Sequence, residues 1–142
     1  MVVSRIFWDT NLFIYLFENY GVLSERVADV RLRMLGRGDE LLTSTLTLGE
    51  ILVKPSEAGK AQLKATYEEA ITKVATVVPF ARETARLYAE IRRDRLIRPP
   101  DAIQLACAAH ARVDLFITND DRLAAKTIAG IHFIQSLDRA FL

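Results

Sequence analysis

Four acidic residues are spaced along the chain so that they could converge on one site. They are Asp9, Glu50, Asp101 and Asp120. Asp9 and Asp120 each follow a short apolar segment typical of a buried strand, and Asp101 follows the break at Pro99-Pro100. Glu50 lies in a short segment expected to be helical. Because ligands of open α/β sheets bind at the carboxyl ends of the strands, we expect the four side chains at one edge of a sheet.

A cluster of carboxylates implies a cation. Ionised carboxyl groups that lie close together repel one another, and a divalent ion removes that repulsion. Mg²⁺ and Mn²⁺ prefer oxygen ligands of this kind. Such ions hold phosphate oxygens, activate water and stabilise the leaving oxygen of an in-line displacement. The pattern therefore predicts phosphodiester chemistry with Mg²⁺ or Mn²⁺ as the cofactor.

Each acid also has an ordinary structural explanation. Asp9 and Asp120 could cap the helices that follow them, and Asp101 could open its helix and interact with the helix dipole. Glu50 could simply face solvent. All four explanations would have to hold by chance near one edge of the sheet, which favours a common site. Asp121, the neighbour of Asp120, could share its role.

The segments between these residues alternate between strands and helices. Strands are expected at 4–8, 41–44, 76–78, 115–117 and 131–134. Helices are expected at 12–17, 24–35, 47–53, 63–74, 81–94, 102–112 and 122–128, with Pro55 closing the third. This alternation predicts an α/β fold with a parallel sheet and right-handed crossovers.

The composition is that of a globular protein. The 142 residues are 51% hydrophobic and 26% charged, which predicts one domain spanning 1–142. Cys107 is the only cysteine, so no intrachain disulfide can form and a cysteine-based zinc site is not expected. The sequence holds no glycine-rich dinucleotide motif and no P-loop motif. No signal peptide or apolar membrane span is recognised, so we expect a soluble, cytoplasmic protein without membrane contacts.

Four short motifs occur in order along nearly the whole chain. They are Trp8-Asp9-Thr10-Asn11, Thr47-Leu48-Gly49-Glu50, Pro100-Asp101-Ala102-Ile103-Gln104-Leu105-Ala106 and Thr118-Asn119-Asp120. In order, spacing and total length the sequence resembles the PIN domain, specifically the VapC-type ribonuclease toxins of bacterial toxin–antitoxin pairs. Leu123 departs from the pattern, because many relatives carry an aromatic residue there, and we expect this to change packing and not chemistry.

The resemblance implies a fold, an activity and partners. The implied fold is a three-layer α/β/α sandwich whose parallel five-stranded sheet has the order 3-2-1-4-5. The implied activity is metal-dependent endoribonuclease, with RNA as substrate, a homodimer as the assembly and a cognate antitoxin whose C-terminal segment covers the site. The implied metal-binding catalytic acids are Asp9, Glu50, Asp101 and Asp120, and the implied supporting residues are Asn11 and Thr118.

Two other functions are compatible with an acidic pocket. One is a receiver-like module that senses a phosphoryl group with Mg²⁺, but that function needs a lysine from a late strand. The strand expected at 131–134 has none, and Lys126 lies on the preceding segment. The other is a PIN-like domain kept as a non-catalytic interaction module, against which the four intact acids count.

The basic residues suggest how RNA could be held. The net charge is only +1, but 14 of the 19 basic residues are arginine, whose planar fork suits phosphate oxygens. Residues 82–98 carry six arginines against three acids. We expect Arg92, Arg93 and Arg95 to contact RNA, the alternative being a solvated helix face.

Overall fold

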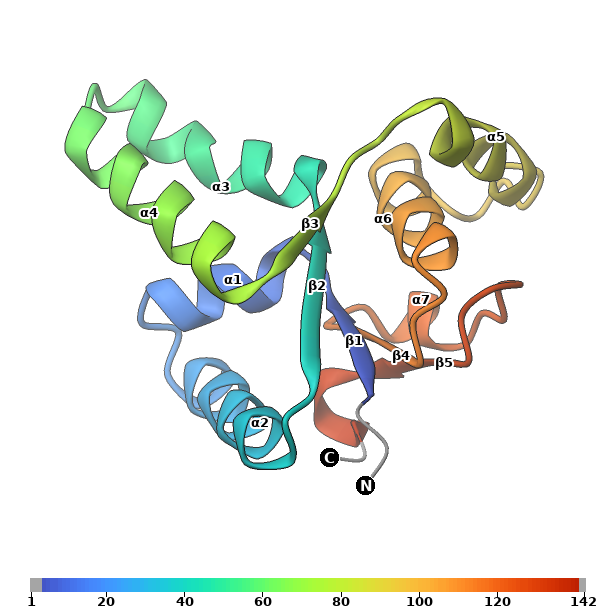
Figure 1. Cartoon of the computed structure of the whole chain (residues 1–142), viewed down its shortest axis with the longest axis horizontal. Coiled ribbons are helices and arrows are strands. Elements are labelled where there is room, and N and C mark those ends of the chain that lie inside the picture. Colours follow the sequence, from blue (N-terminus) through green and yellow to red (C-terminus); the bar gives the residue numbers. More distant parts are fainter. Residues whose placement is uncertain (1–3, 141–142) are drawn as a thin grey trace.

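A parallel sheet forms the centre of the molecule (Figure 1). The structure is a computed structural model that describes residues 4–140, so the expected domain bounds of 1–142 extend outside the described residues at both ends. Its strands are β1 (Arg5–Trp8), β2 (Glu40–Ser44), β3 (Thr76–Val78), β4 (Leu115–Thr118) and β5 (Phe133–Ser136). Every neighbouring pair is parallel and the order is β3-β2-β1-β4-β5. The predicted strand order is confirmed.

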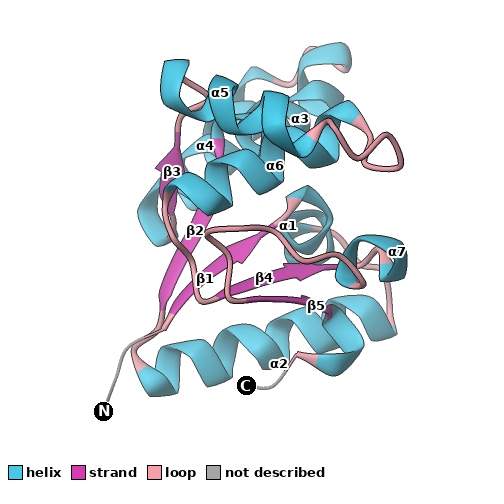
Figure 2. Cartoon of the chain, turned by 90° about the vertical axis from the view of Figure 1, so that its right-hand side faces the viewer, coloured by secondary structure: helices cyan, strands magenta, loops and turns pink. Residues whose placement is uncertain are grey.

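Helices cover both faces of this sheet. They are α1 (Thr10–Phe17), α2 (Val22–Arg37), α3 (Thr45–Glu57), α4 (Ala61–Val74), α5 (Arg82–Ile91), α6 (Pro99–His110) and α7 (Asp121–Ala124), and a 3-10 turn follows at Leu137–Arg139. Figure 2 shows α2 on one side of the sheet and α5 and α6 on the other. The predicted three-layer α/β/α architecture is therefore confirmed.

Side chains alternate between the two faces along each strand, as the pleat requires. Ile6 and Trp8 on β1 pack in the core cluster that contains residues of α1 and α2. Phe7 points to the opposite cluster, which contains residues of α5 and α6, and stacks on Phe116 of β4 at a centroid distance of 5.1 Å. Because both faces are buried, residues 6–8 of β1 and 115–117 of β4 are continuous apolar runs with no polar alternation.

Three prolines behave differently from the sequence prediction. Pro55 does not close its helix: α3 continues to Glu57, and the Lys60 N–H donates to the Pro55 carbonyl at 2.9 Å. Pro55 lies in the last turn, so its missing N–H removes a single helical hydrogen bond. Pro99 and Pro100 form the first turn of α6, where N–H groups have no helical partner. Asp101 therefore lies inside that first turn, after the N-cap residue Arg98.

Several of the expected helix and strand boundaries are wrong. β5 begins at Phe133 and not at residue 131, and α7 ends at Ala124 and not at residue 128. Ile131 is only 7% exposed, but it packs against the α5–α6 cluster from the turn that precedes β5. α5 ends at Ile91 and not at residue 94, since the N–H groups that follow bond the carbonyls three residues back. α1 begins at Thr10, and α2 at Val22, each two residues before the expected start.

Gly130 fixes the turn that leads into β5, and we predict that Gly130→Ala destabilises the protein. Its φ is +95°, and an added Cβ would lie 2.9 Å from the Ala109 carbonyl oxygen at the end of α6. Positive φ and this collision should together lower the free energy of unfolding by about 1–3 kcal/mol.

Gly36→Ala in α2 is the control for this substitution. No atom lies within 4 Å of its added Cβ, so it should instead stabilise the protein by roughly 0.5–1 kcal/mol. Urea titrations followed by circular dichroism measure both effects. Equal effects of the two substitutions would contradict the close approach at Gly130.

Candidate active site

The candidate site lies where the strand order reverses, between β1 and β4. Trp8, the last residue of β1, is paired with Ile117 of β4, so these two strands end side by side. Asp9 follows β1 directly and occupies the N-cap position of α1. Asp120 follows β4 by two residues and precedes α7. In open α/β sheets this reversal opens the crevice that receives a ligand.

Two neighbouring cavities contain the four predicted acids. Asp9, Glu50 and Asp101 line a cavity of about 370 Å³, together with Thr10 and Gln104 among others. Asp101 also lines a second cavity of about 300 Å³, which Asp120 lines too. Asp101 therefore connects the two groups of acids. Across residues 4–140, no three Asp, Glu, His or Cys side chains are grouped tightly enough to hold a metal ion as they stand.

Asp9 carries a carboxylate that its surroundings compensate only in part. Its Oδ1 is buried without a hydrogen-bond partner. Burial raises its pKa from 3.8 to about 7, and the Asp101 charge adds to the rise. Hydrogen bonds from the Thr118 hydroxyl and from the Asn11 and Leu12 N–H groups at the start of α1 lower the pKa but do not offset the burial. Contacts with the start of α1 therefore do not balance the charge of Asp9.

Asp101 and Asp120 are tuned in opposite directions. Burial raises the pKa of Asp101, with Arg98 and Arg122 opposing the rise and Asp120 adding to it. Burial also acts to raise the pKa of Asp120, but the N–H and the guanidinium of Arg122 outweigh it and lower that pKa overall. Asp120 does cap α7, because its Oδ1 accepts from the Arg122 N–H at 2.9 Å. The capping explanation thus holds for Asp120, which nevertheless faces Asp101.

Glu50 is exposed but held in place by a buried network. The Thr10 hydroxyl donates to Glu50 Oε1 at 2.5 Å and accepts from Gln104 Nε2 at 3.1 Å. Gln104 is only 4% exposed. Its Nε2 also donates to Thr47 Oγ1 at 2.8 Å, and its Oε1 accepts from Ser44 Oγ at 2.6 Å. Every polar atom of this amide is used, so the network joins β2, α1, α3 and α6 around the acids.

The four polar residues of this network are not among the site residues predicted from the sequence. Thr10, Thr47 and Gln104 lie inside the quoted motifs, and Ser44 ends the strand before the second motif. A usable signal exists for Gln104 alone. It is a polar residue within the alanine-rich run 102–109, and a buried amide requires hydrogen-bond partners.

The predicted supporting residues are placed differently from one another. Thr118 is buried and bonds the Asp9 carboxylate, and its Oγ1 accepts from the Asp120 N–H at 3.1 Å. It therefore joins the two acids that follow β1 and β4. Asn11 is exposed and lines the first cavity. Asp121 is exposed and lines a separate depression with Arg139, so Asp120 and not Asp121 is next to Asp101.

The three arginines predicted to contact RNA lie at and after the end of α5. Arg92 donates through Nη1 to the Ile97 carbonyl at 2.7 Å and so holds the turn between α5 and α6. Arg93 pairs with Glu90 at 3.3 Å, and Arg95 is exposed. None of the three lines either of the two cavities. Their contact with RNA stays a prediction.

The donor atoms of the site fit a hard divalent cation. All four acids offer carboxylate oxygens, the ligands that Mg²⁺ and Mn²⁺ prefer. Asp9 Oδ1 has no hydrogen-bond partner, and a bound ion would supply the positive charge that this oxygen needs. Repulsion between Asp9 and Asp101 would fall at the same time.

Comparisons with known proteins agree with this geometry. The family model described as PIN domain matches residues 6–128. A VapBC2 structure from Rickettsia felis, bound to a DNA fragment from the promoter, is similar with a TM-score of 0.72 at 14% identity, over 93% of this chain and 98% of that chain. DNA-bound VapBC from Salmonella typhimurium gives 0.71 at 20% identity, over 95% and 99%. A toxin–antitoxin complex from Klebsiella pneumoniae gives 0.66 at 21% identity, over 89% and 94%. No curated protein matches the sequence.

We predict that Gln104→Met destabilises the protein by about 2–4 kcal/mol, because it leaves buried hydroxyl groups without partners. Methionine keeps the length of the side chain but removes the amide that serves Ser44, Thr47 and Thr10. Gln62→Met on the exposed surface of α4 is the control, and should change stability by less than about 0.5 kcal/mol. Denaturant unfolding measures both, and a neutral Gln104→Met would contradict the importance of the network.

We also predict a pH dependence of stability in the metal-free protein. The folded state binds a proton on Asp9 more tightly than the unfolded chain does, since its pKa is about 7 in place of 3.8. The stabilisation from protonated Asp9 is therefore complete at low pH and is lost as the pH rises from about 4 to about 7. Each tenfold difference in proton affinity corresponds to about 1.4 kcal/mol.

Asp9→Asn isolates this contribution. It should be more stable than the wild type at pH 8 and nearly equal to it at pH 4, in denaturant titrations with EDTA. Asp29→Asn, an exposed substitution on α2, is the control and should keep the wild-type profile. Parallel pH profiles for Asp9→Asn and the wild type would show that Asp9 does not titrate in this way.

Proposed function

Because the chain belongs to the PIN domain family, we propose that it is a metal-dependent endoribonuclease and the toxin of a toxin–antitoxin pair. One observation supports this most strongly: Asp9 has a buried carboxylate oxygen without a partner, in a cavity that Asp101 also lines. A carboxylate placed there without a counter-charge costs free energy unless a cation binds. The domain as a whole, 1–142, is proposed as one catalytic unit.

The acids would divide the work of binding between them. Bound Mg²⁺ or Mn²⁺ supplies charge neutralisation, polarisation of the phosphate and an activated water. Asp9 and Asp101 would hold the ion, with Asp120 completing the set of direct ligands and Glu50 taking part through a water molecule. Thr118 positions Asp9 through its hydroxyl group. Asn11, exposed at the wall of the cavity, would orient water.

Glu50 is also suited to accept a proton. Its Oε1 accepts a hydrogen bond from the Thr10 hydroxyl, and this contact orients the carboxylate. Oε2 does not take part in that contact, and the residue is exposed. We propose that Oε2 would take the proton of a water molecule as the oxygen of that water bonds to phosphorus and the P–O bond to the leaving oxygen breaks, and that the leaving oxygen would take a proton from solvent. Gln104 then acts as a positioning residue, because it holds Thr10.

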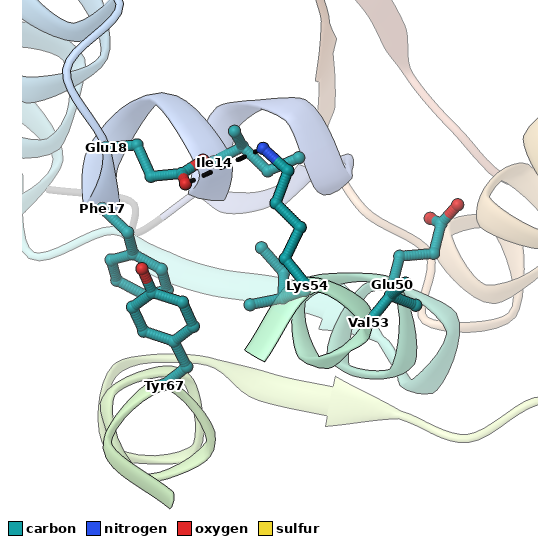
Figure 3. A pocket seen from close by; sticks show the side chains of 8 residues that line it. Ile14, Phe17, Glu18, Glu50, Val53, Lys54 and Tyr67 are labelled. Atoms are coloured by element: carbon teal, nitrogen blue, oxygen red, sulfur yellow. Dashed lines mark ion pairs between the residues drawn. The ribbon is translucent and has the colours of Figure 1, made fainter. Parts of the chain in front are cut away.

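An apolar groove beside the acids is the proposed place for an antitoxin segment. It lies between α1, α3 and α4, where Phe17 stacks on Tyr67 at a centroid distance of 5.1 Å (Figure 3). An ion pair between Glu18 and Lys54, at 3.9 Å, spans its rim. The groove shares Glu50 with the acid cavity, so a segment in it would block the approach to the acids. The similar structure from Klebsiella pneumoniae is a toxin–antitoxin complex.

The remaining partners follow from the same proposal. RNA is the proposed substrate, with Arg92, Arg93 and Arg95 as outer contacts, and a homodimer is the proposed assembly. Within residues 4–140, no helix is long and apolar enough to cross a membrane. RNA and an antitoxin protein would both be met in the cytoplasm, which is where we propose that the protein acts.

We predict that the purified protein cleaves cellular RNA with Mg²⁺ or Mn²⁺, and that EDTA abolishes cleavage. Asp101→Asn should reduce cleavage by orders of magnitude, because a metal ligand is lost. The same substitution should stabilise the metal-free protein by about 1 kcal/mol, because a repelling charge is removed. Asp29→Asn should change neither property. RNA gel analysis and thermal melting with and without Mn²⁺ measure the two effects.

Cleavage that survives exhaustive chelation would contradict the proposed mechanism. A fully active Asp101→Asn protein would instead remove Asp101 from the site. Loss of activity together with higher metal-free stability is the result that helix opening alone cannot give, because neutral asparagine in the first turn of α6 would lose the favourable interaction with the helix dipole and would not raise stability.

A further inference from the structure

We propose that the second cavity beside Asp101, rimmed by Arg98, Arg122 and Lys126, is a phosphate-binding subsite for the nucleotide adjacent to the one cleaved. This inference rests on the proposed nuclease function and specifies where its substrate lies. It also assigns roles to Arg122 and Lys126, which lie outside the arginine-rich segment 82–98, and to Arg98, the last arginine of that segment.

The position of the cavity suits a continuous strand. Asp101 lines both this cavity and the acid cavity that contains Asp9 and Glu50. When a phosphodiester is held at the acids, the neighbouring nucleotide of the strand therefore lies either in the second cavity, next to Asp101, or in solvent. The second cavity, about 300 Å³ in volume, offers that nucleotide a place.

The two arginines are available to an anionic ligand. Arg98 Nε lies 3.9 Å from Asp101 Oδ2, and Arg122 Nε lies 3.5 Å from Asp120 Oδ1. Their side chains are 70% and 81% exposed, so these ion pairs contribute little to stability. Each guanidinium has further N–H groups, and its planar fork suits two phosphate oxygens.

Lys126 is held more firmly than the arginines. Its Nζ lies 2.8 Å from Asp94 Oδ2, and its side chain is only 27% exposed. The hydrogen bond from Lys126 is the main cause that lowers the pKa of Asp94, which keeps this pair ionised. Lys126 therefore contributes a fixed charge at the wall of the cavity, whereas the arginines can reorient.

The charges around the cavity predict coupling between metal and RNA. Without a metal, each of the three cations has an acidic partner: Asp101, Asp120 or Asp94. A divalent ion on Asp101 and its neighbours would leave Arg98 and Arg122 without compensation. The cavity would then become cationic and attract phosphate. Metal binding and RNA binding should thus strengthen each other.

Apolar side chains complete a surface that suits a nucleotide. Leu96 lines the cavity and is 82% exposed, a high value for a leucine, while its neighbour Ile97 is buried. A ribose or base can pack on Leu96 as its phosphate meets the arginines. Arg92 holds this turn through the Ile97 carbonyl, so it is a positioning residue for Leu96 and Arg98.

The first test is binding of RNA without cleavage. A fluorescein-labelled single-stranded RNA is titrated in Ca²⁺, a hard divalent ion that replaces Mg²⁺ at the acids, with the wild type and with Arg98→Ala/Arg122→Ala, by fluorescence anisotropy at several salt concentrations. Loss of two phosphate contacts should flatten the plot of log affinity against log salt by about 1.4 and weaken binding about tenfold or more at 0.1 M salt. Arg33→Ala/Lys73→Ala, which removes two exposed, ion-paired cations from α2 and α4, is the matched control and should keep the wild-type slope.

The second test is binding of Mn²⁺ by isothermal titration calorimetry. Arg98→Ala/Arg122→Ala should bind Mn²⁺ more tightly than the wild type, because Asp101 and Asp120 lose their counter-charges. The two ligands therefore respond in opposite directions, which a general loss of folding cannot produce. In cleavage assays the same variant should raise KM with little change in kcat.

The outcomes separate this inference from the proposed nuclease function. Unchanged RNA affinity and salt slope in Arg98→Ala/Arg122→Ala would overturn the subsite, even if the wild type cleaves RNA. Equal weakening by the control pair would also overturn it, since binding would then follow total charge. If RNA binds through this cavity but no metal supports cleavage, the subsite stands and the nuclease function fails.

Discussion

The buried carboxylate of Asp9 is the constraint on which the organisation of the site depends. β1 is the central strand of the sheet, and Asp9, directly after it, is half-buried in the wall of the acid cavity with its Oδ1 fully buried. An ionised carboxylate there requires compensation. The chain supplies part of it through the Thr118 hydroxyl and the N–H groups at the start of α1, and the pKa of Asp9 still rises to about 7. A site built in this way favours a cation over an empty state.

Glu50, on the side of the acid cavity formed by α3, is held in place by hydrogen bonds from neutral groups. Gln104 uses its whole amide to join Ser44, Thr47 and Thr10, and so couples three helices to the end of β2. Glu50 receives its orientation from this network and not from a charged partner. The division is physically sensible, since a positive side chain beside Glu50 would compete with the metal for the same oxygens. Arginines occur instead at the Asp101–Asp120 side, where the pairs are exposed and loose.

Much of the fold follows from the sequence, but side-chain networks do not. Buried parallel strands appear as short apolar runs, so β1 to β4 were predicted within one or two residues. The start of β5 was predicted two residues too early, because Ile131 is apolar and buried like a strand residue although it lies in the turn before the strand. Pro55 and Pro99 misled the prediction of helix boundaries because proline is tolerated at helix ends. Asp9 and Asp120 were predicted from their positions after apolar runs, Asp101 from the proline pair before it, and Glu50 from its place on the helix after the second strand. Gln104 and Thr10 were missed because their partners lie far away in sequence.

Whether Asp9 binds a cation can be decided by locating a bound ion. Crystals of the protein soaked in Mn²⁺ and measured at an X-ray energy where manganese scatters anomalously reveal the ion independently of any assay. We expect an anomalous peak within coordination distance of Asp9 Oδ1 and of the Asp101 carboxylate, and its absence in Asp9→Asn crystals soaked in the same way. A fully occupied ion elsewhere on the protein, with no peak at Asp9, would show that the buried carboxylate is not a metal ligand.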